Sequence, residues 1–156
     1  MKKLLLTLTL AVCFMVFVNA QDYNTGIGLR LGFYNGLTVK HFIGEKSALE
    51  GIVATRWKGI GITGLYEIHN QLLNVDGVNW YFGLGGHVGF YDGDHTDWGK
   101  PDTKYTVIGV DGILGIEYNF SEVPISISAD WKPAYDLAGN TKFWYDGGAL
   151  SIRYIF

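Results

Sequence analysis

The chain has 156 residues, with 12 basic and 15 acidic side chains and a formal net charge of −3. That length is typical of a single domain, and the slightly acidic balance, without a basic run, excludes the electrostatic footprint of a nucleic-acid-binding protein. Glycine and aromatic residues are frequent, whereas proline occurs only 3 times, which favours many strands joined by turns.

Residues 1–20 have the pattern of a secretory signal peptide. Two lysines precede an apolar run over residues 4–18, and Ala20 supplies the small residue at the expected cleavage site. The single cysteine, Cys13, lies in this run without the small residue before it that a lipoprotein signal requires, so we expect no lipidation. The expected mature chain, residues 21–156, has no cysteine and forms one domain.

From Thr25 onward, apolar residues alternate with small or polar ones, a period of two that is typical of β-strands. The first strand has Ile27 and Leu29 on one face and Gly28 and Arg30 on the other. Turn residues divide the pattern into eight predicted strands. They cover residues 25–33, 37–43, 49–57, 60–69, 80–91, 107–120, 125–132 and 147–156.

Strands of roughly 8 to 12 residues match the length that a tilted strand needs to cross a bilayer. An even number of strands places both ends of the chain on the same side of the membrane. With the N-terminus in the periplasm, the two longest loops, 92–104 and 133–146, face outward. The sequence therefore predicts an all-β fold, an eight-stranded antiparallel up-and-down transmembrane β-barrel.

The last predicted strand ends on Phe156, with Leu150, Ile152 and Tyr154 at every second position before it. It resembles the C-terminal strand by which outer-membrane β-barrels are recognised for assembly. The alternative is the closing strand of a soluble β-sandwich. The segments 109–120 and 124–133 resemble a family of small outer-membrane barrels of the Bacteroidota, and the whole pattern is similar to the OmpA and OmpX type of transmembrane domain.

These resemblances imply a location in the outer membrane, contact with its lipids and lipopolysaccharide, and insertion by the barrel-assembly machinery. Aromatic side chains agree with such a threading, because they prefer the two membrane interfaces. Four are expected at outer strand ends, namely Phe33, Trp57, Phe90 and Trp131. Seven are expected toward inner ends, namely Tyr66, Trp80, Phe82, Tyr118, Phe120, Tyr154 and Phe156.

The inward-facing positions of the predicted barrel carry as many acids as bases. Because an unpaired buried charge costs about 3 to 5 kcal/mol, we predict a paired network that plugs the lumen and leaves no water-filled pore. Asp111 and Arg30 are expected near its centre. The full set is Arg30, Lys40, Arg56, Lys132 and Arg153 with Glu50, Glu67, Asp111, Glu117 and Asp130.

Two inward histidines, His69 and His87, are candidates for a general base or a metal ligand, but no triad spacing surrounds them. The lipid A deacylase type of barrel has a His-x-Ser pair, which this sequence lacks, and the palmitoyl-transferase type resembles a barrel after an amphipathic helix, for which residues 21–25 leave no room. We therefore expect no enzyme activity and no cofactor, with a lipid A-modifying enzyme and a narrow channel as alternatives.

The two long loops carry the remaining candidate sites. Loop 92–104 has four aspartates but neither the twelve-residue pattern nor the closing glutamate of a calcium loop, so we expect a solvated loop without metal. Loop 133–146 contains Phe143, Trp144 and Tyr145, and exposed aromatics of this kind suit either a protein or glycan partner or packing over the barrel mouth. We expect a monomer with a structural or interaction role.

Overall fold

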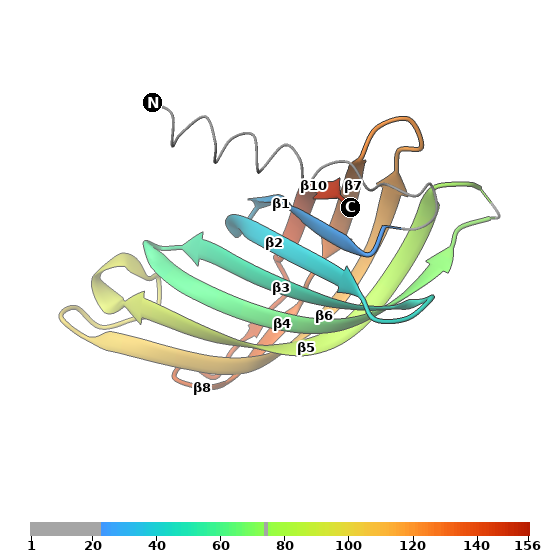
Figure 1. Cartoon of the computed structure of the whole chain (residues 1–156). Helices are drawn as coiled ribbons and strands as arrows, with labels where there is room; N and C mark the ends of the chain where they lie inside the picture. Colours follow the sequence, from blue (N-terminus) through green and yellow to red (C-terminus); the bar gives the residue numbers. More distant parts are fainter. Residues whose placement is uncertain (1–22, 74) are drawn as a thin grey trace, which may run out of the picture.

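The computed structural model describes residues 23–73 and 75–156, and these form a closed antiparallel β-barrel (Figure 1). The expected signal peptide lies outside the described residues. Neighbouring strands pair in the order β5-β4-β3-β2-β1-β10-β7-β6, and pairing between β5 and β6 closes the barrel. This confirms the predicted eight-stranded fold. The strands of the wall are β1 (Thr25–Gly32), β2 (Asn35–Phe42), β3 (Ser47–Arg56), β4 (Gly59–Gln71), β5 (Val78–Asp92), β6 (Lys104–Asn119), β7 (Ile125–Trp131) and β10 (Gly148–Ile155).

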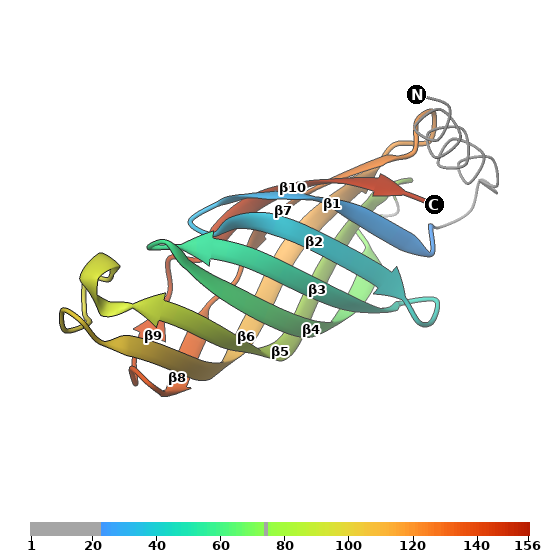
Figure 2. The ribbon, with the colours of Figure 1, turned by 60° about the vertical axis from the view of Figure 1, so that its left-hand side comes forward.

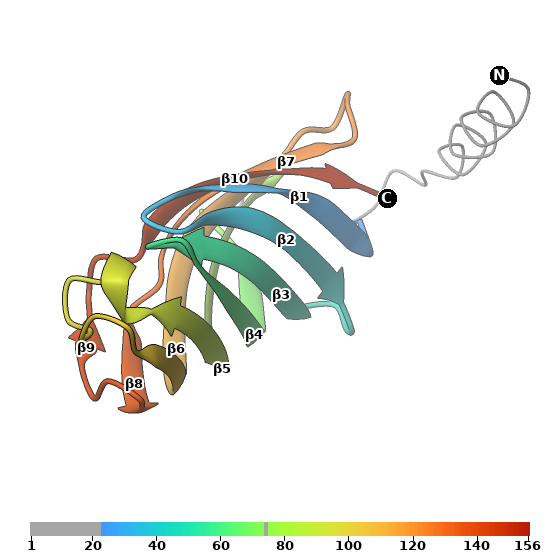
Figure 3. The same ribbon diagram turned by 90° about the vertical axis from the view of Figure 1, so that its left-hand side faces the viewer.

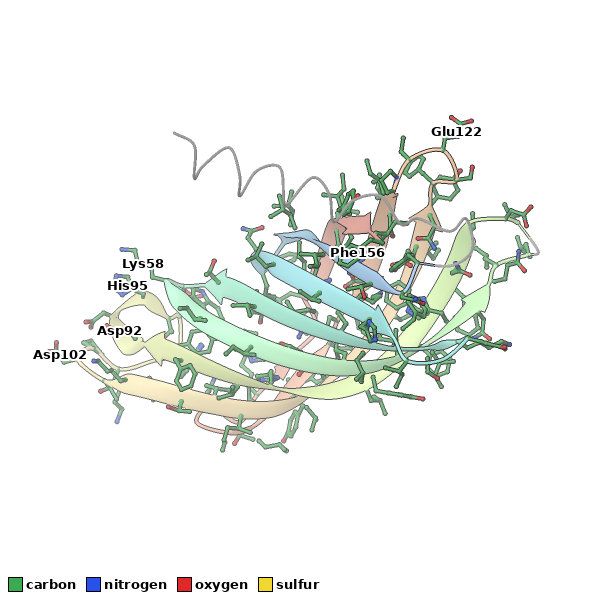
Figure 4. All side chains as sticks on the ribbon, in the orientation of Figure 1. Lys58, Asp92, His95, Asp102, Glu122 and Phe156 are labelled. Atoms are coloured by element: carbon green, nitrogen blue, oxygen red, sulfur yellow. The ribbon has the colours of Figure 1, made fainter. Side chains whose placement is uncertain are left out.

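The two ends of the barrel differ in what they carry. Lys58, Asp92, His95 and Asp102 lie at one end, and Phe156 lies toward the other, with the turn that carries Glu122 (Figure 4). We call the first the loop end and the second the terminal end. At the terminal end the first and last strands are joined by reciprocal backbone hydrogen bonds between residues 25 and 156, of 2.9 and 2.8 Å.

Side chains alternate between the outside and the lumen along every strand of the wall. On β6, Val110 is 48% exposed on the outer surface, whereas its neighbour Asp111 is 2% exposed inside. The outer surface is thus apolar and the interior is charged, the reverse of a water-soluble protein. A continuous apolar exterior of this extent indicates contact with a nonaqueous environment. Among the described residues, no helix has the length and hydrophobicity needed to cross a membrane.

The wall on the β6 side is taller than sequence patterning predicts. Residues 133–146 were expected to form a loop, but they contain β8 (Ala134–Ala138) and β9 (Phe143–Trp144), which pair with each other. β8 also pairs with β6 beyond the end of β7, so both strands extend the barrel at the loop end (Figure 2). Pro133 interrupts the strand pattern, yet its carbonyl accepts a hydrogen bond from the backbone N–H of Gly112 at 2.9 Å.

The loop end also contains the only described helical turn, the 3₁₀ turn η1 (Gly93–His95), which follows β5 and lies at the same end as β8 and β9 (Figure 3). A second difference from the sequence prediction concerns Trp57. It was expected to end a strand over residues 49–57, but β3 ends at Arg56 and Trp57 has a positive φ of 49°. This turn conformation places the indole against Arg56 and Trp144, over the barrel mouth.

Candidate functional site

The candidate site is the charged lumen. Nine of the ten residues named as a lumen network are buried inside the barrel, and Arg56 is half-buried at the loop end. Three of the four residues named for the assembly-signal strand, Leu150, Ile152 and Phe156, are exposed on the outer surface, and Tyr154 is half-buried. The lumen charges divide into three buried groups and one ion pair at the mouth.

The group nearest the terminal end, here called the terminal cluster, consists of Lys40, Glu50, Glu67, Glu117 and Arg153, which come from five different strands. Lys40 Nζ lies 2.8 Å from Glu67 Oε2 and 3.5 Å from one oxygen of each of the other two glutamates. Arg153 lies 2.6 Å from Glu50 Oε1 and 3.4 Å from Glu117 Oε2. Each cation therefore bridges several acids.

Neutral side chains complete this cluster. The Tyr23 hydroxyl donates to Glu117 at 2.7 Å, and Arg153 donates to Ser128 at 2.8 Å. The Lys40 ammonium lies 4.0 Å from the centre of the Tyr81 ring, a cation–π contact. The His69 ring stacks on the Tyr81 ring, with 4.8 Å between the two ring centres. The lumen is thus filled by packed rings as well as by ion pairs.

Arg30 and Asp130 form the middle group. Their side chains make two parallel hydrogen bonds, of 2.7 and 2.5 Å, and both are buried. The Tyr81 hydroxyl adds a third donor to Asp130, at 3.2 Å. A bidentate arginine–carboxylate pair is the strongest common form of ion pair in proteins, so this group fixes β1 to β7 across the lumen.

The loop-side cluster consists of Asp111, Lys132, His87 and Asp136. Lys132 donates to Asp111, and the His87 ring lies between the two aspartates, with Nδ1 2.7 Å from Asp111 and Nε2 3.1 Å from Asp136. Both ring nitrogens donate only in the imidazolium form, which is the form that suits two carboxylate neighbours. Neither nitrogen is then free to act as a general base. Sequence reasoning missed Asp136, because it lies on β8, inside the expected loop.

Glycines on β6 make these contacts possible. Gly109 pairs with His87 on one side and with Asp136 on the other. A Cβ at Gly109 would lie 2.5 Å from the His87 ring, so the imidazole reaches Asp136 only across a residue without a side chain. Gly115 has the same place between Tyr81 and Asp130. A glycine between two inward polar residues is a signal that sequence reasoning could have used.

An ion pair at the mouth joins Arg56 to Asp146 at 2.8 Å. The guanidinium also donates to the Tyr34 hydroxyl at 2.8 Å and lies 3.9 Å from the Trp57 ring centre. Burial raises the pKa of the Tyr34 phenol, which therefore remains a neutral acceptor. Asp146, like Asp136, lies in the segment expected to be a loop, so the lumen contains two more acids than sequence reasoning assigned to it.

Two separate spaces remain inside the barrel. A small cavity of about 40 Å³ is lined by Trp57, Trp98 and Trp144, among other residues. It has room for only a few water molecules. A wider recess of about 900 Å³ opens at the terminal end, beside Tyr23 and His69. The two spaces share no lining residue, because the middle group and the terminal cluster fill the lumen between them.

The aspartates of residues 92–104 stabilise the loop backbone. Asp92 accepts a hydrogen bond from the backbone N–H of Asp94 at 3.2 Å, and Asp94 accepts one from that of Asp102 at 2.9 Å. Within residues 23–73 and 75–156, no group of three metal-binding side chains is found.

Comparisons with known proteins give a fold but no family. No protein-family model and no curated protein matches the sequence. Among solved structures, the chain is similar to the crystal structure of the N-terminal β-barrel domain of Pseudomonas aeruginosa OprF, with a TM-score of 0.66 and 15% identity over 87% of this chain and 100% of that one. This likeness shows the fold alone, a closed eight-stranded antiparallel β-barrel. The comparisons give no support to an origin in the Bacteroidota.

Proposed function

We propose that this protein is an integral outer-membrane β-barrel with a closed lumen, which acts through its loop end as a structural or interaction protein. One observation carries the proposal: apolar side chains cover the outside of the closed barrel, while ionised side chains are paired inside it. Only an apolar solvent around the barrel makes this distribution favourable, because every exposed apolar Å² costs about 25 cal/mol in water.

Closure of the lumen is supported by its contacts. An ion that moved along the barrel axis would have to part the pair of Arg30 and Asp130 and then the terminal cluster. Separating one buried pair costs about 3 to 5 kcal/mol, and on the loop side only about 40 Å³ is open to receive displaced side chains. These costs oppose both a porin-like pore and a narrow channel.

The loop end is the part of the protein that offers contacts to a partner. Phe143 and Tyr145 are exposed there, while Trp144 packs against Trp57 and donates to Asp136. A pair of basic side chains, Lys58 and His95, lies at the same end, 3.1 Å apart. Exposed aromatics beside charged groups suit a protein or glycan partner, reached from outside the cell.

Conductance across a planar lipid bilayer tests the closed lumen. We expect the purified protein to insert without producing steady ion conductance, under conditions in which a water-filled porin produces it. Insertion should be verified separately, by recovery of the protein with the lipid fraction. A large and steady conductance from the inserted wild-type barrel would show that the lumen is open.

A further inference from the structure

The terminal cluster has an excess of acid. Glu50, Glu67 and Glu117 are buried there against only two cations, Lys40 and Arg153. If all five groups were ionised, the cluster would carry a net charge in a region without solvent. An uncompensated buried charge is costly, and the usual response of a protein is to bind or release a proton.

Two of these glutamates share one cation. Glu50 and Glu67 face the lumen from adjacent strands, and both carboxyl groups lie against the same ammonium group, with Lys40 Nζ 3.5 Å from Glu50 Oε2 and 2.8 Å from Glu67 Oε2. Glu50 Oε2 and Glu67 Oε1 are the two buried carboxylate oxygens of the cluster without a hydrogen-bond donor. Two buried carboxylates that share one ammonium group repel each other when both are ionised, and a proton on one of them removes this repulsion and supplies the missing donor.

We propose that the lumen contains a proton-binding site at which Glu67 is a neutral carboxylic acid and donates its proton to ionised Glu50. Glu50 is the ionised partner because its Oε1 accepts from both Arg153 and Thr38. On Glu67 the other oxygen, Oε2, remains free to accept from Lys40 at 2.8 Å and from His69 at 3.0 Å.

This assignment makes each part of the lumen electrically neutral. Protonated Glu67 leaves two acids and two bases in the terminal cluster. Arg30 and Asp130 cancel each other, and the loop-side cluster has two aspartates against Lys132 and the His87 imidazolium. Arg56 and Asp146 cancel at the mouth. The proton-binding site is argued from contacts inside the folded lumen alone, so it does not depend on the proposed location of the protein in the outer membrane.

The groups that surround Glu67 come from every neighbouring part of the lumen. Lys40 on β2 and His69 on β4 contact Glu67 directly. Around these two lie Glu50 on β3, Tyr81 on β5, Glu117 on β6, Arg153 on β10 and Tyr23 before β1. His69 Nδ1 has no partner, which agrees with a neutral imidazole that donates from Nε2. Because His69 is neutral, the proton that makes the terminal cluster electrically neutral is assigned to Glu67.

Isosteric substitutions distinguish the three glutamates. Glu67→Gln keeps the neutral state and should leave the urea midpoint of unfolding in lipid vesicles at neutral pH close to the wild-type value. Glu117→Gln removes a charge from an ion pair and should increase the unfolding equilibrium constant by roughly 100-fold or more. Equal destabilisation by both substitutions would overturn the proposal.

Two further measurements use the folded wild-type protein. Infrared spectra at neutral pH should contain a carboxylic-acid C=O band that is lost in Glu67→Gln and kept in Glu117→Gln. Absence of the band from the wild type would overturn the proposal.

A folded chain that retains a proton released on unfolding loses stability as pH rises. The free energy of unfolding of the wild type should therefore fall as the pH is raised above the acidic range, and that of Glu67→Gln should fall less. A midpoint that depends instead on Na⁺ or K⁺ concentration would identify a cation site and overturn the proton assignment.

Discussion

Replacement of Asp130 by asparagine is expected to lower the free energy of unfolding by about 3 to 5 kcal/mol. The substitution removes the carboxylate that receives two hydrogen bonds from Arg30, and Arg30 is buried with no other carboxylate in hydrogen-bonding contact. The guanidinium is then left as an unpaired charge in the middle of the lumen. Reversible urea unfolding in lipid vesicles measures the effect.

The matched control is Asp146→Asn, which breaks the same kind of ion pair at the mouth. The side chains of Arg56 and Asp146 are 14% and 26% exposed, so solvent and salt screen the remaining charge, and we expect a loss of about 0 to 1 kcal/mol. A double variant, Arg30→Met with Asp130→Asn, should recover most of the loss because it leaves no charge unpaired. Equal losses in Asp130→Asn and Asp146→Asn would contradict a desolvated lumen.

The second large effect is expected on the outer surface. Val110→Arg should destabilise the barrel by about 2 to 4 kcal/mol, because a cation near the middle of the lipid-facing wall loses its hydration. Val123→Arg is the control, since Val110 and Val123 are 48% and 44% exposed, but Val123 lies in the turn at the terminal end. There we expect about 0 to 1 kcal/mol.

The comparison of the two valines separates a membrane barrel from a soluble one. In water, both arginines would be solvated equally, and neither substitution would change the unfolding free energy by more than about 0.5 kcal/mol. Unfolding of both variants in the same vesicles therefore decides between the two environments. Similar small effects at both positions would count against a lipid-facing exterior.

The strands and their two faces could be predicted because a strand has a strict period of two. Once Ile27 and Leu29 are placed outside, Arg30 must face inside, and one slipped residue would reverse every side chain. The pairing of β1 with β10 was also predictable, since the C-terminal strand of an up-and-down barrel must meet the first. In the structure Ile27 lies opposite Tyr154.

The pairing inside the lumen could not be predicted. Glu50 and Arg153 are 103 residues apart in sequence, and Lys40 and Glu117 are 77 apart, so their contact depends on the stagger of strands around the barrel. Residues 133–146 were wrongly expected to form a loop because Pro133 breaks the apolar alternation. This error concealed Asp136 and Asp146, and with them the acid excess that requires an imidazolium at His87. Trp57 was wrongly included in the third strand because the alternation pattern does not reveal that a turn begins there.

The most direct test of the apolar exterior is the accessibility of a nitroxide label on a cysteine introduced at Leu84, whose side chain is 75% exposed on the outer wall. In lipid vesicles this label should collide readily with dissolved oxygen and should be protected from a water-soluble nickel chelate. A label at Asp97, in the loop, should show the opposite preference. If the nickel chelate reaches position 84 as readily as position 97, the outer wall faces water and the membrane barrel is contradicted.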